Sequence, residues 1–338
     1  MMCMRTISFS LAVLAAILLS ASSHADSTQT AKRGRALERV NTCLQRNEYS
    51  SRQCKKLNEN IGILTGVYRS GDKSVLPILL RFPYLTDFYG EAVLSDSQGF
   101  LTALAQLSKK DQQEVASGLA GGMFGIRSRE RFDAIRILLT ENISESSSTK
   151  EVAQLCLKSF ETNNAEFFVK YFPPQTFTSR GADFTIHWYS REMYRLGEQP
   201  LWTRSSPNET YRFTYLGAFT APKTVTLTMQ GDGTGQVSMT TLSETDEISQ
   251  VELPVSQEQF TKFVVQLDQA HFWNMPPESS RRGNDGAEWI MEAIQNGRYR
   301  TAVRWCPDIT RYSVDDEAFA KAALLLLEFS GYKHTGNC

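Results

Sequence analysis

The chain has 338 residues and is nearly neutral, with 36 Lys and Arg residues against 37 Asp and Glu residues. This balance gives no electrostatic reason to expect a nucleic acid or an anionic membrane surface as a partner. Apolar residues make up 41% of the chain, which is typical of a globular protein, and the length is sufficient for two domains.

Residues 1–25 have the features of a secretory signal peptide. A short start with one positive charge, Arg5, precedes an apolar run at Ile7–Leu19, and Ser23 and Ala25 form a small-x-small cleavage site. The run is too short for a stable membrane span of roughly 20 residues. We therefore expect a periplasmic or secreted protein with no membrane span after cleavage. An uncleaved N-terminal anchor is the alternative.

Beyond this segment the chain keeps an odd number of cysteines, so at least one thiol is free or pairs between chains. Outside the cytoplasm disulfides are permitted. The cysteines and the remaining histidines show no metal-ligand spacing, so we expect no metal site and no cofactor. The five cysteines are Cys43, Cys54, Cys156, Cys306 and Cys338.

The two halves of the chain follow different patterns, and Pro173 and Pro174 mark a boundary because proline ends helices. We predict a helical domain over 26–180 and an α+β domain over 187–338. The tryptophans all lie in the second half, at Trp188, Trp202, Trp273, Trp289 and Trp305.

The first domain shows apolar residues at helical spacing, and Ser108 with Asp111 is typical of a helix start. Successive short amphipathic helices must bury their apolar faces against each other. This predicts an irregular all-α helical array, with a solenoid-like stack as one possible form. The three clearest apolar stripes are Phe100, Leu104 and Leu107; Phe132, Ile135 and Leu139; and Val152, Cys156 and Phe160.

The second domain alternates apolar and polar residues from Tyr211 onward, which predicts β-strands, and the glycine-rich segment 231–235 predicts a hairpin turn. Because a strand follows this turn, it is not a phosphate-binding loop. Ser256 begins a helix as an N-cap, and Ser313 begins a final one. We predict an α+β fold with an antiparallel sheet and two helices on one of its faces.

A second hairpin is predicted at Asn296-Gly297, the favoured type I′ pair. In this register Ile290 and Val303 share one face, which we expect to be the core face. The other face is a candidate binding surface for an acidic or aromatic partner, because an arginine over an indole forms a cation–π pair. The alternative is an ordinary outer sheet face, with Trp289 shielded by the arginine stems or by the helical half. The candidate residues are Trp289, Arg298, Arg300 and Arg304.

No catalytic motif occurs in the sequence. Cys156 lies on an apolar helix face, and His187 and His271 have no evident partner, so we expect structural roles for all three. Asp285-Gly286 followed by Glu292 resembles the end of a calcium loop, but Arg281 and Gly283 would occupy the first two ligand positions and cannot supply a carboxylate.

Aromatic residues and glycines recur in the second half, between about Tyr211 and Gly331, in the motifs Phe272-Trp273, Asp285-Gly286, Trp289-Ile290, Glu292, Gly297-Arg298-Tyr299 and Arg304-Trp305-x-Pro307. In these motifs the chain resembles a family of exported bacterial proteins. The resemblance implies neither an activity nor a ligand.

These observations favour an exported, non-catalytic protein that binds a protein or another envelope partner, or that has a structural role in the cell envelope. The alternative is a hydrolase acting on an envelope polymer through paired carboxylates, with Glu288 and Glu292 as candidates. A concave pocket that holds two carboxylates in perturbed environments would favour the enzyme.

We predict two disulfides, Cys43–Cys54 and Cys306–Cys338. The first would close a loop of about a dozen residues across a helical turn and would stabilise the fold by roughly 3 kcal/mol. The second would tie down the C-terminal tail, which extends about 23–25 Å and nearly spans the last helix.

Peptide mapping without reduction should find both linked pairs. Freely alkylated Cys338, or a link from Cys338 to Cys156 or to another chain, would contradict the second.

Overall fold

The structure is a computed structural model. It describes residues 30–44, 56–82, 84–121, 125–126, 128–144, 149–179, 181–204, 208–243, 247–279, 283, 285–309 and 313–334. The predicted signal peptide lies outside these residues. The chain divides into a helical unit, up to residue 122 and over 133–159, and a sheet unit, over 123–132 and 160–338. Residues 160–180, which we expected in the helical domain, therefore group with the sheet.

The helical unit confirms the predicted all-α half. Side chains of the predicted stripes are buried, including Phe100, Leu104, Ile135 and Leu139, and Ser108 caps its helix by accepting from the Asp111 amide. None of the helices described in the chain is both long and apolar enough to cross a membrane. After a helix over 30–44 come α2 (Leu57–Arg69), η2 (Lys73–Val75), α3 (Leu76–Leu79), α4 (Thr86–Ser95), α5 (Ser97–Ala105), α6 (Lys109–Leu119), α7 (Arg129–Ser144) and α8 (Lys150–Asn163).

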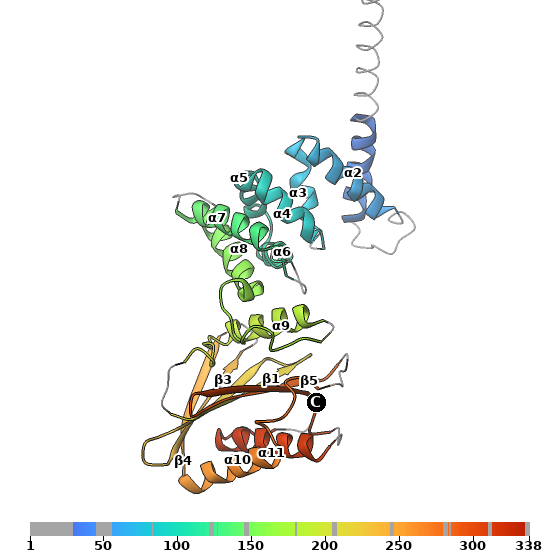
Figure 1. The fold of residues 1–338 in the computed structure, drawn as a ribbon. Helices are drawn as coiled ribbons and strands as arrows, with labels where there is room; N and C mark the ends of the chain where they lie inside the picture. The colour runs from blue at the N-terminus through green and yellow to red at the C-terminus, as the bar shows by residue number, and fades with distance from the viewer. Residues whose placement is uncertain are drawn as a thin grey trace, which may run out of the picture. The chain divides into compact units, whose positions relative to one another are not determined.

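The sheet unit contains a six-stranded antiparallel sheet in the order β4-β3-β2-β1-β5-β6, which confirms the predicted α+β architecture. Helix α9 lies on one face, and α10 and α11 lie on the other (Figure 1). The elements are η4 (Ala165–Phe167), α9 (Ala182–Arg195), β1 (Thr210–Gly217), β2 (Lys223–Met229), β3 (Gly235–Leu242), β4 (Ile248–Val255), α10 (Gln257–Gln269), β5 (Ala287–Gln295), β6 (Arg298–Trp305) and α11 (Val314–Phe329).

Local sequence signals place several of these elements. Ser256 and Gln259 form the predicted capping box of α10. Asn296 and Gly297 have φ angles of 52° and 72°, as a type I′ turn requires at both central positions. The turn sets the β5–β6 register as predicted, with Gln295 opposite Arg298.

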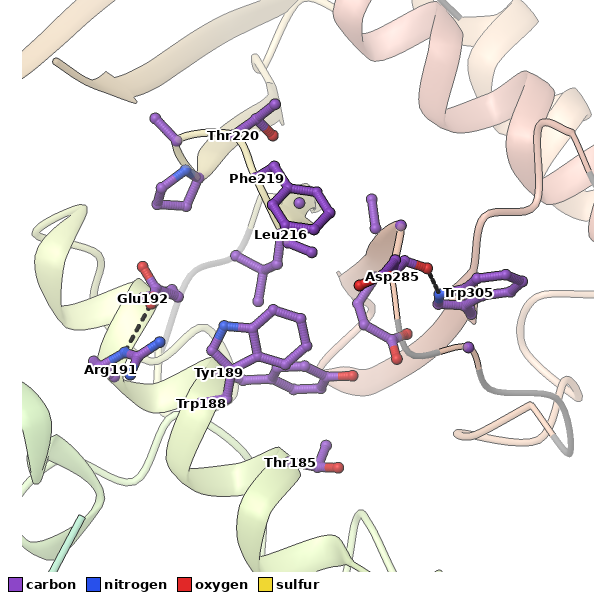
Figure 2. Close-up of a pocket in the computed structure, with 18 of the residues that line it drawn as sticks. Thr185, Trp188, Tyr189, Arg191, Glu192, Leu216, Phe219, Thr220, Asp285 and Trp305 are labelled. Carbon is purple, nitrogen blue, oxygen red and sulfur yellow. Dashed lines mark hydrogen bonds and ion pairs between the residues drawn. The ribbon is translucent and has the colours of Figure 1, made fainter. Parts of the chain in front are cut away.

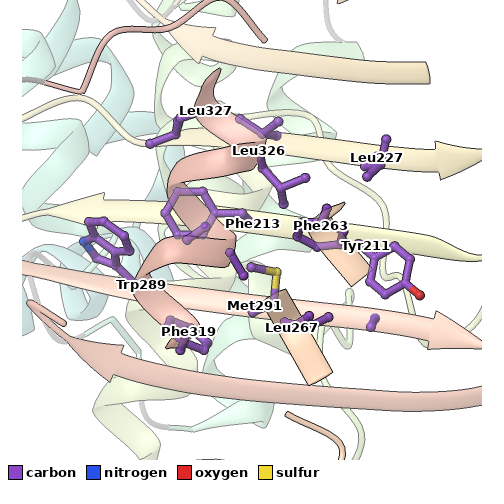
Figure 3. Packing of buried hydrophobic residues seen from close by; sticks show 14 of the residues in the cluster. Tyr211, Phe213, Leu227, Phe263, Leu267, Trp289, Met291, Phe319, Leu326 and Leu327 are labelled. Carbon is purple, nitrogen blue, oxygen red and sulfur yellow. The ribbon is translucent and has the colours of Figure 1, made fainter. Parts of the chain in front are cut away.

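The face of the sheet under α10 and α11 is the larger apolar core (Figure 3). The side chains of Tyr211 and Phe213 in β1, together with Trp289 and Met291 in β5, are fully buried there. Phe319 of α11 packs against them. The prediction of two helices on one face is therefore correct, but the predicted core face of the second hairpin was the other one.

The opposite face is mainly polar and supports a third helix that we did not assign to the sheet. Residues Tyr189 and Met193 of α9 pack on a small apolar cluster that includes Leu216, Ile290 and Val303. Thr214 faces the same side, because its hydroxyl lies 3.6 Å from the Met193 sulfur. Both faces of the central strands β1 and β5 are thus covered.

The cysteines are buried where the structure describes them. Cys156 is a free thiol on α8, and burial raises its pKa to about 12. Cys43 and Cys306 are disulfide-bonded. Cys54 and Cys338 lie outside the described residues, so the two pairings stay predictions.

Candidate functional site

A pocket of about 710 Å³ lies within the sheet unit, between α9 and the loops at one end of strands β1, β5 and β6. Its volume falls in the range of about 300–1,000 Å³ that is usual for small-molecule sites. Figure 2 shows the Trp188 and Tyr189 rings of α9 on one side, with Phe219 and Asp285 across from them.

Helix α9 supplies an aromatic half and a charged half to this pocket. Phe184 and Trp188 are four residues apart and therefore lie on one side of the helix, with their ring centroids 6.2 Å apart. One to two turns further on, Glu192 is buried and accepts from Arg191 at 2.8 Å and from Arg195 at 2.6 Å. Glu192 thus offsets part of the positive charge of the two guanidinium groups.

The opposite wall is built from two loops that contact each other closely. The Ala218 amide donates to the Gly286 carbonyl at 2.8 Å, which joins the β1–β2 loop to the segment before β5. Gly286 has a φ of +120°, and a Cβ at this position would lie 2.5 Å from the Cys306 sulfur. Only glycine fits there, because both the backbone angle and the space exclude a side chain.

Aromatic side chains stand at the edge of this wall. The Trp305 indole donates to the Asp285 carbonyl at 3.1 Å, and a Cβ on Gly283 would lie 1.9 Å from the indole ring. The loop backbone therefore packs directly on Trp305 and fixes its position. Phe219 is 84% exposed in the β1–β2 loop, which leaves its ring accessible to a ligand.

A buried ion cluster ties the end of α9 to the sheet. Arg212 of β1 and Glu292 of β5 are fully buried, and Arg212 contacts the Glu292 carboxylate at 2.7 and 2.8 Å. The same guanidinium donates to Glu198 at 3.0 Å and to the Gln199 carbonyl at 2.7 Å, just beyond α9. Thr224 of β2 donates to Glu198 at 2.5 Å. The segment that follows α9 is thereby held by β1 and β2, and Glu292 of β5 holds Arg212 from the other side.

Electrostatics assign this cluster a structural role. Burial raises the pKa of Glu292 above its ordinary value, while the Arg212 charge and the Tyr299 hydrogen bond act in the opposite direction. Burial lowers the pKa of Arg212, but the Glu292 and Glu198 carboxylates outweigh it and raise the pKa above its ordinary value. Arg212 is therefore charged, and Glu292 is sequestered beside it rather than exposed to a ligand.

The predicted binding face does not form as expected. Trp289 is fully buried under α11, and Arg304 is buried with its Nε 2.7 Å from Asp316. Arg300 donates to the Met275 carbonyl, and the exposed Arg298 donates to the Trp273 carbonyl at 2.9 Å. Helices cover both sides of β5 and β6. The alternation of side chains along these strands therefore could not identify an outer face.

The other predicted residues separate into different environments. Of the two candidate carboxylates for hydrolysis, Glu288 lines the pocket and Glu292 does not. His187 of α9 lies 2.9 Å from Glu166 through its Nδ1, and the exposed His271 lies 2.9 Å from Asp315. Neither histidine lines the pocket, and both have the partners that the sequence did not reveal.

We did not predict the pocket from the sequence. The spacing of Phe184, Trp188, Arg191 and Arg195 is compatible with one side of a helix and is visible in the sequence. Such a stripe is equally consistent with a buried core face. The loops that complete the pocket come from segments about 30 and 100 residues further along the chain, and no local pattern joins them to α9.

No protein-family model matches this chain, and no curated protein matches it. The interpretation of the pocket therefore rests on its own geometry.

We predict that Arg212→Met destabilises the sheet unit by about 3–5 kcal/mol, because it leaves a buried carboxylate without its partner. Arg298→Met, on an exposed arginine of the same sheet, should cost no more than about 1 kcal/mol. Urea unfolding followed by tryptophan fluorescence measures the effect, since all five tryptophans lie in this unit. The double variant Arg212→Met/Glu292→Leu should recover part of the loss. Equal stability of the two single variants would contradict the assignment.

Proposed function

We propose that this chain is an exported, non-catalytic binding protein that holds its ligand in the pocket between α9 and the β1–β2 loop. The observation that carries the proposal is the pocket of about 710 Å³ with aromatic rings on both walls. Concave sites of this size, with aromatic walls and a few polar groups, are the usual form of ligand sites.

The walls support binding without large rearrangement. Trp188 and Tyr189 are fixed on a helix that packs on the sheet, and Trp305 is fixed against the Gly283 and Gly286 backbone. Rigid aromatic side chains bind with little loss of conformational freedom, which favours affinity. Phe219 is the exception, because its exposed ring can adjust to the ligand.

The hydrolase alternative has weaker support. Paired-carboxylate catalysis needs two carboxyl groups that flank one bond. Of the three acidic residues at the pocket, Glu192 accepts from two arginines, and Asp285 and Glu288 belong to the opposite wall. Glu292, the carboxyl group whose pKa burial raises, is held by Arg212 away from the pocket.

Native mass spectrometry tests the binding proposal. The purified full chain is incubated with the low-molecular-weight fraction of a cell-envelope extract from the producing organism. We expect a small-molecule adduct on the wild type that falls at least tenfold in Trp188→Ala and Phe219→Ala, because both remove aromatic surface from the pocket. Trp273→Ala, the same change outside the pocket, should keep it. No adduct on the wild type, or equal adducts on all four proteins, would contradict the proposal.

Export is part of the same proposal and has its own test. The chain, expressed with its own N-terminus in a bacterium, should yield a mature protein that starts at Asp26, because signal peptidase cleaves after a small-x-small site. N-terminal sequencing of the envelope fraction measures this. Recovery of the intact form beginning at Met1 would instead indicate a retained N-terminal anchor.

A further inference from the structure

We infer that the ligand of this pocket is a short neutral oligosaccharide. The inference rests on the proposed binding function and goes further, because it assigns the chemical class of the ligand. It depends on the distribution of rings, the charge of the walls and the position of the pocket in the sheet.

The aromatic side chains come from three separate segments of the pocket. Trp188 stands on α9, Phe219 stands in the β1–β2 loop, and Trp305 stands at the end of β6. Tyr189 also borders the pocket, but it is buried against Phe172 and Phe177 and does not offer a ring face. A single flat aromatic ligand would need only one such surface. A chain of pyranose rings offers several apolar C–H faces, and each can stack on a different aromatic ring.

The polar side chains match the rim of a sugar. Among the described lining residues, Arg191 and Arg195 carry planar groups of donors, and Asp285 and Glu288 carry planar groups of acceptors. Neighbouring hydroxyls on a pyranose both donate and accept, and they can pair with such groups around the ring edge. The aromatic rings would then contact the faces while the charged groups contact the edges.

The charges of the described lining residues favour a neutral ligand over an acidic polymer. Among these residues, two are basic, Arg191 and Arg195, and three are acidic, Glu192, Asp285 and Glu288. Glu192 already accepts from both arginines at 2.8 and 2.6 Å, so little positive charge remains for an anion. A neutral ligand has no desolvated charge that would need compensation.

The sheet does not favour an extended peptide here. Peptides commonly bind by adding a strand to an exposed sheet edge. Of the strands that reach the pocket, β1 and β5 are interior, since β1 pairs with β2 and β5, and β5 pairs with β1 and β6. The third, β6, is the edge strand, but the Val303 amide on its outer side donates to the Pro277 carbonyl at 2.8 Å. A peptide would therefore have to displace this segment in order to add a strand.

Isothermal titration of the full chain tests the inference with five probes. Chitotriose, maltotriose and cellotriose are the neutral ones, trigalacturonate is anionic and trilysine is cationic. We expect saturable binding of at least one neutral trisaccharide, weakened at least tenfold by Trp188→Ala and by Phe219→Ala. Because Phe219 is 84% exposed, its loss should not unfold the chain, and thermal melting checks this. Trp273→Ala, outside the pocket, should bind as the wild type does.

The outcomes separate the two proposals. If trilysine or trigalacturonate binds and loses affinity in Phe219→Ala, while no neutral trisaccharide binds, the oligosaccharide inference is overturned and the binding pocket stands. If neutral trisaccharides bind equally well to Phe219→Ala and Trp188→Ala, they bind elsewhere, and the inference is also overturned. If none of the five probes binds to the wild type, the oligosaccharide inference is overturned, and the adduct measured by native mass spectrometry decides the binding proposal separately.

Discussion

The contact between Arg212 and the two carboxylates of Glu198 and Glu292 is the constraint on which the sheet unit depends. A fully buried guanidinium is costly unless several oxygens accept from it, and here Glu292, Glu198 and the Gln199 carbonyl all do so. Because two of these acceptors follow α9 in the chain, satisfying the arginine also fixes where α9 ends. The polar interior of this face therefore determines the place of a helix rather than simply filling space.

The placement of α9 has a direct consequence for the shape of this face. The opposite face of the sheet is closed by α10 and α11 over a continuous apolar core, whereas α9 covers the polar face with only a small apolar cluster beneath it. Beside that cluster α9 and the loops near Gly217 and Gly286 leave a pocket instead of a packed interface. The two faces of one sheet are thus built differently: one is closed by a continuous apolar core, and the other leaves the pocket in which we propose that the ligand binds.

The sequence predicted the local elements of this fold well and the burial of their faces poorly. The capping box at Ser256 and the turn at Asn296 depend on neighbours in the chain, and both formed as predicted. The assignment of Trp289 to an outer face failed, because alternation shows that two faces differ but not which helices cover them. The burial of Arg212 could not be predicted from its neighbours in the chain, since its partner Glu292 is 80 residues away.

Hydrogen exchange of α9 in Glu198→Gln is the most direct test of this account. The substitution keeps the shape of the side chain but removes the charge that holds Arg212 next to the end of α9. We expect faster exchange in α9, while α10 and α11 keep the protection of the wild type, because their apolar core is untouched. Unchanged exchange in α9, or an equal increase in all three helices, would contradict it.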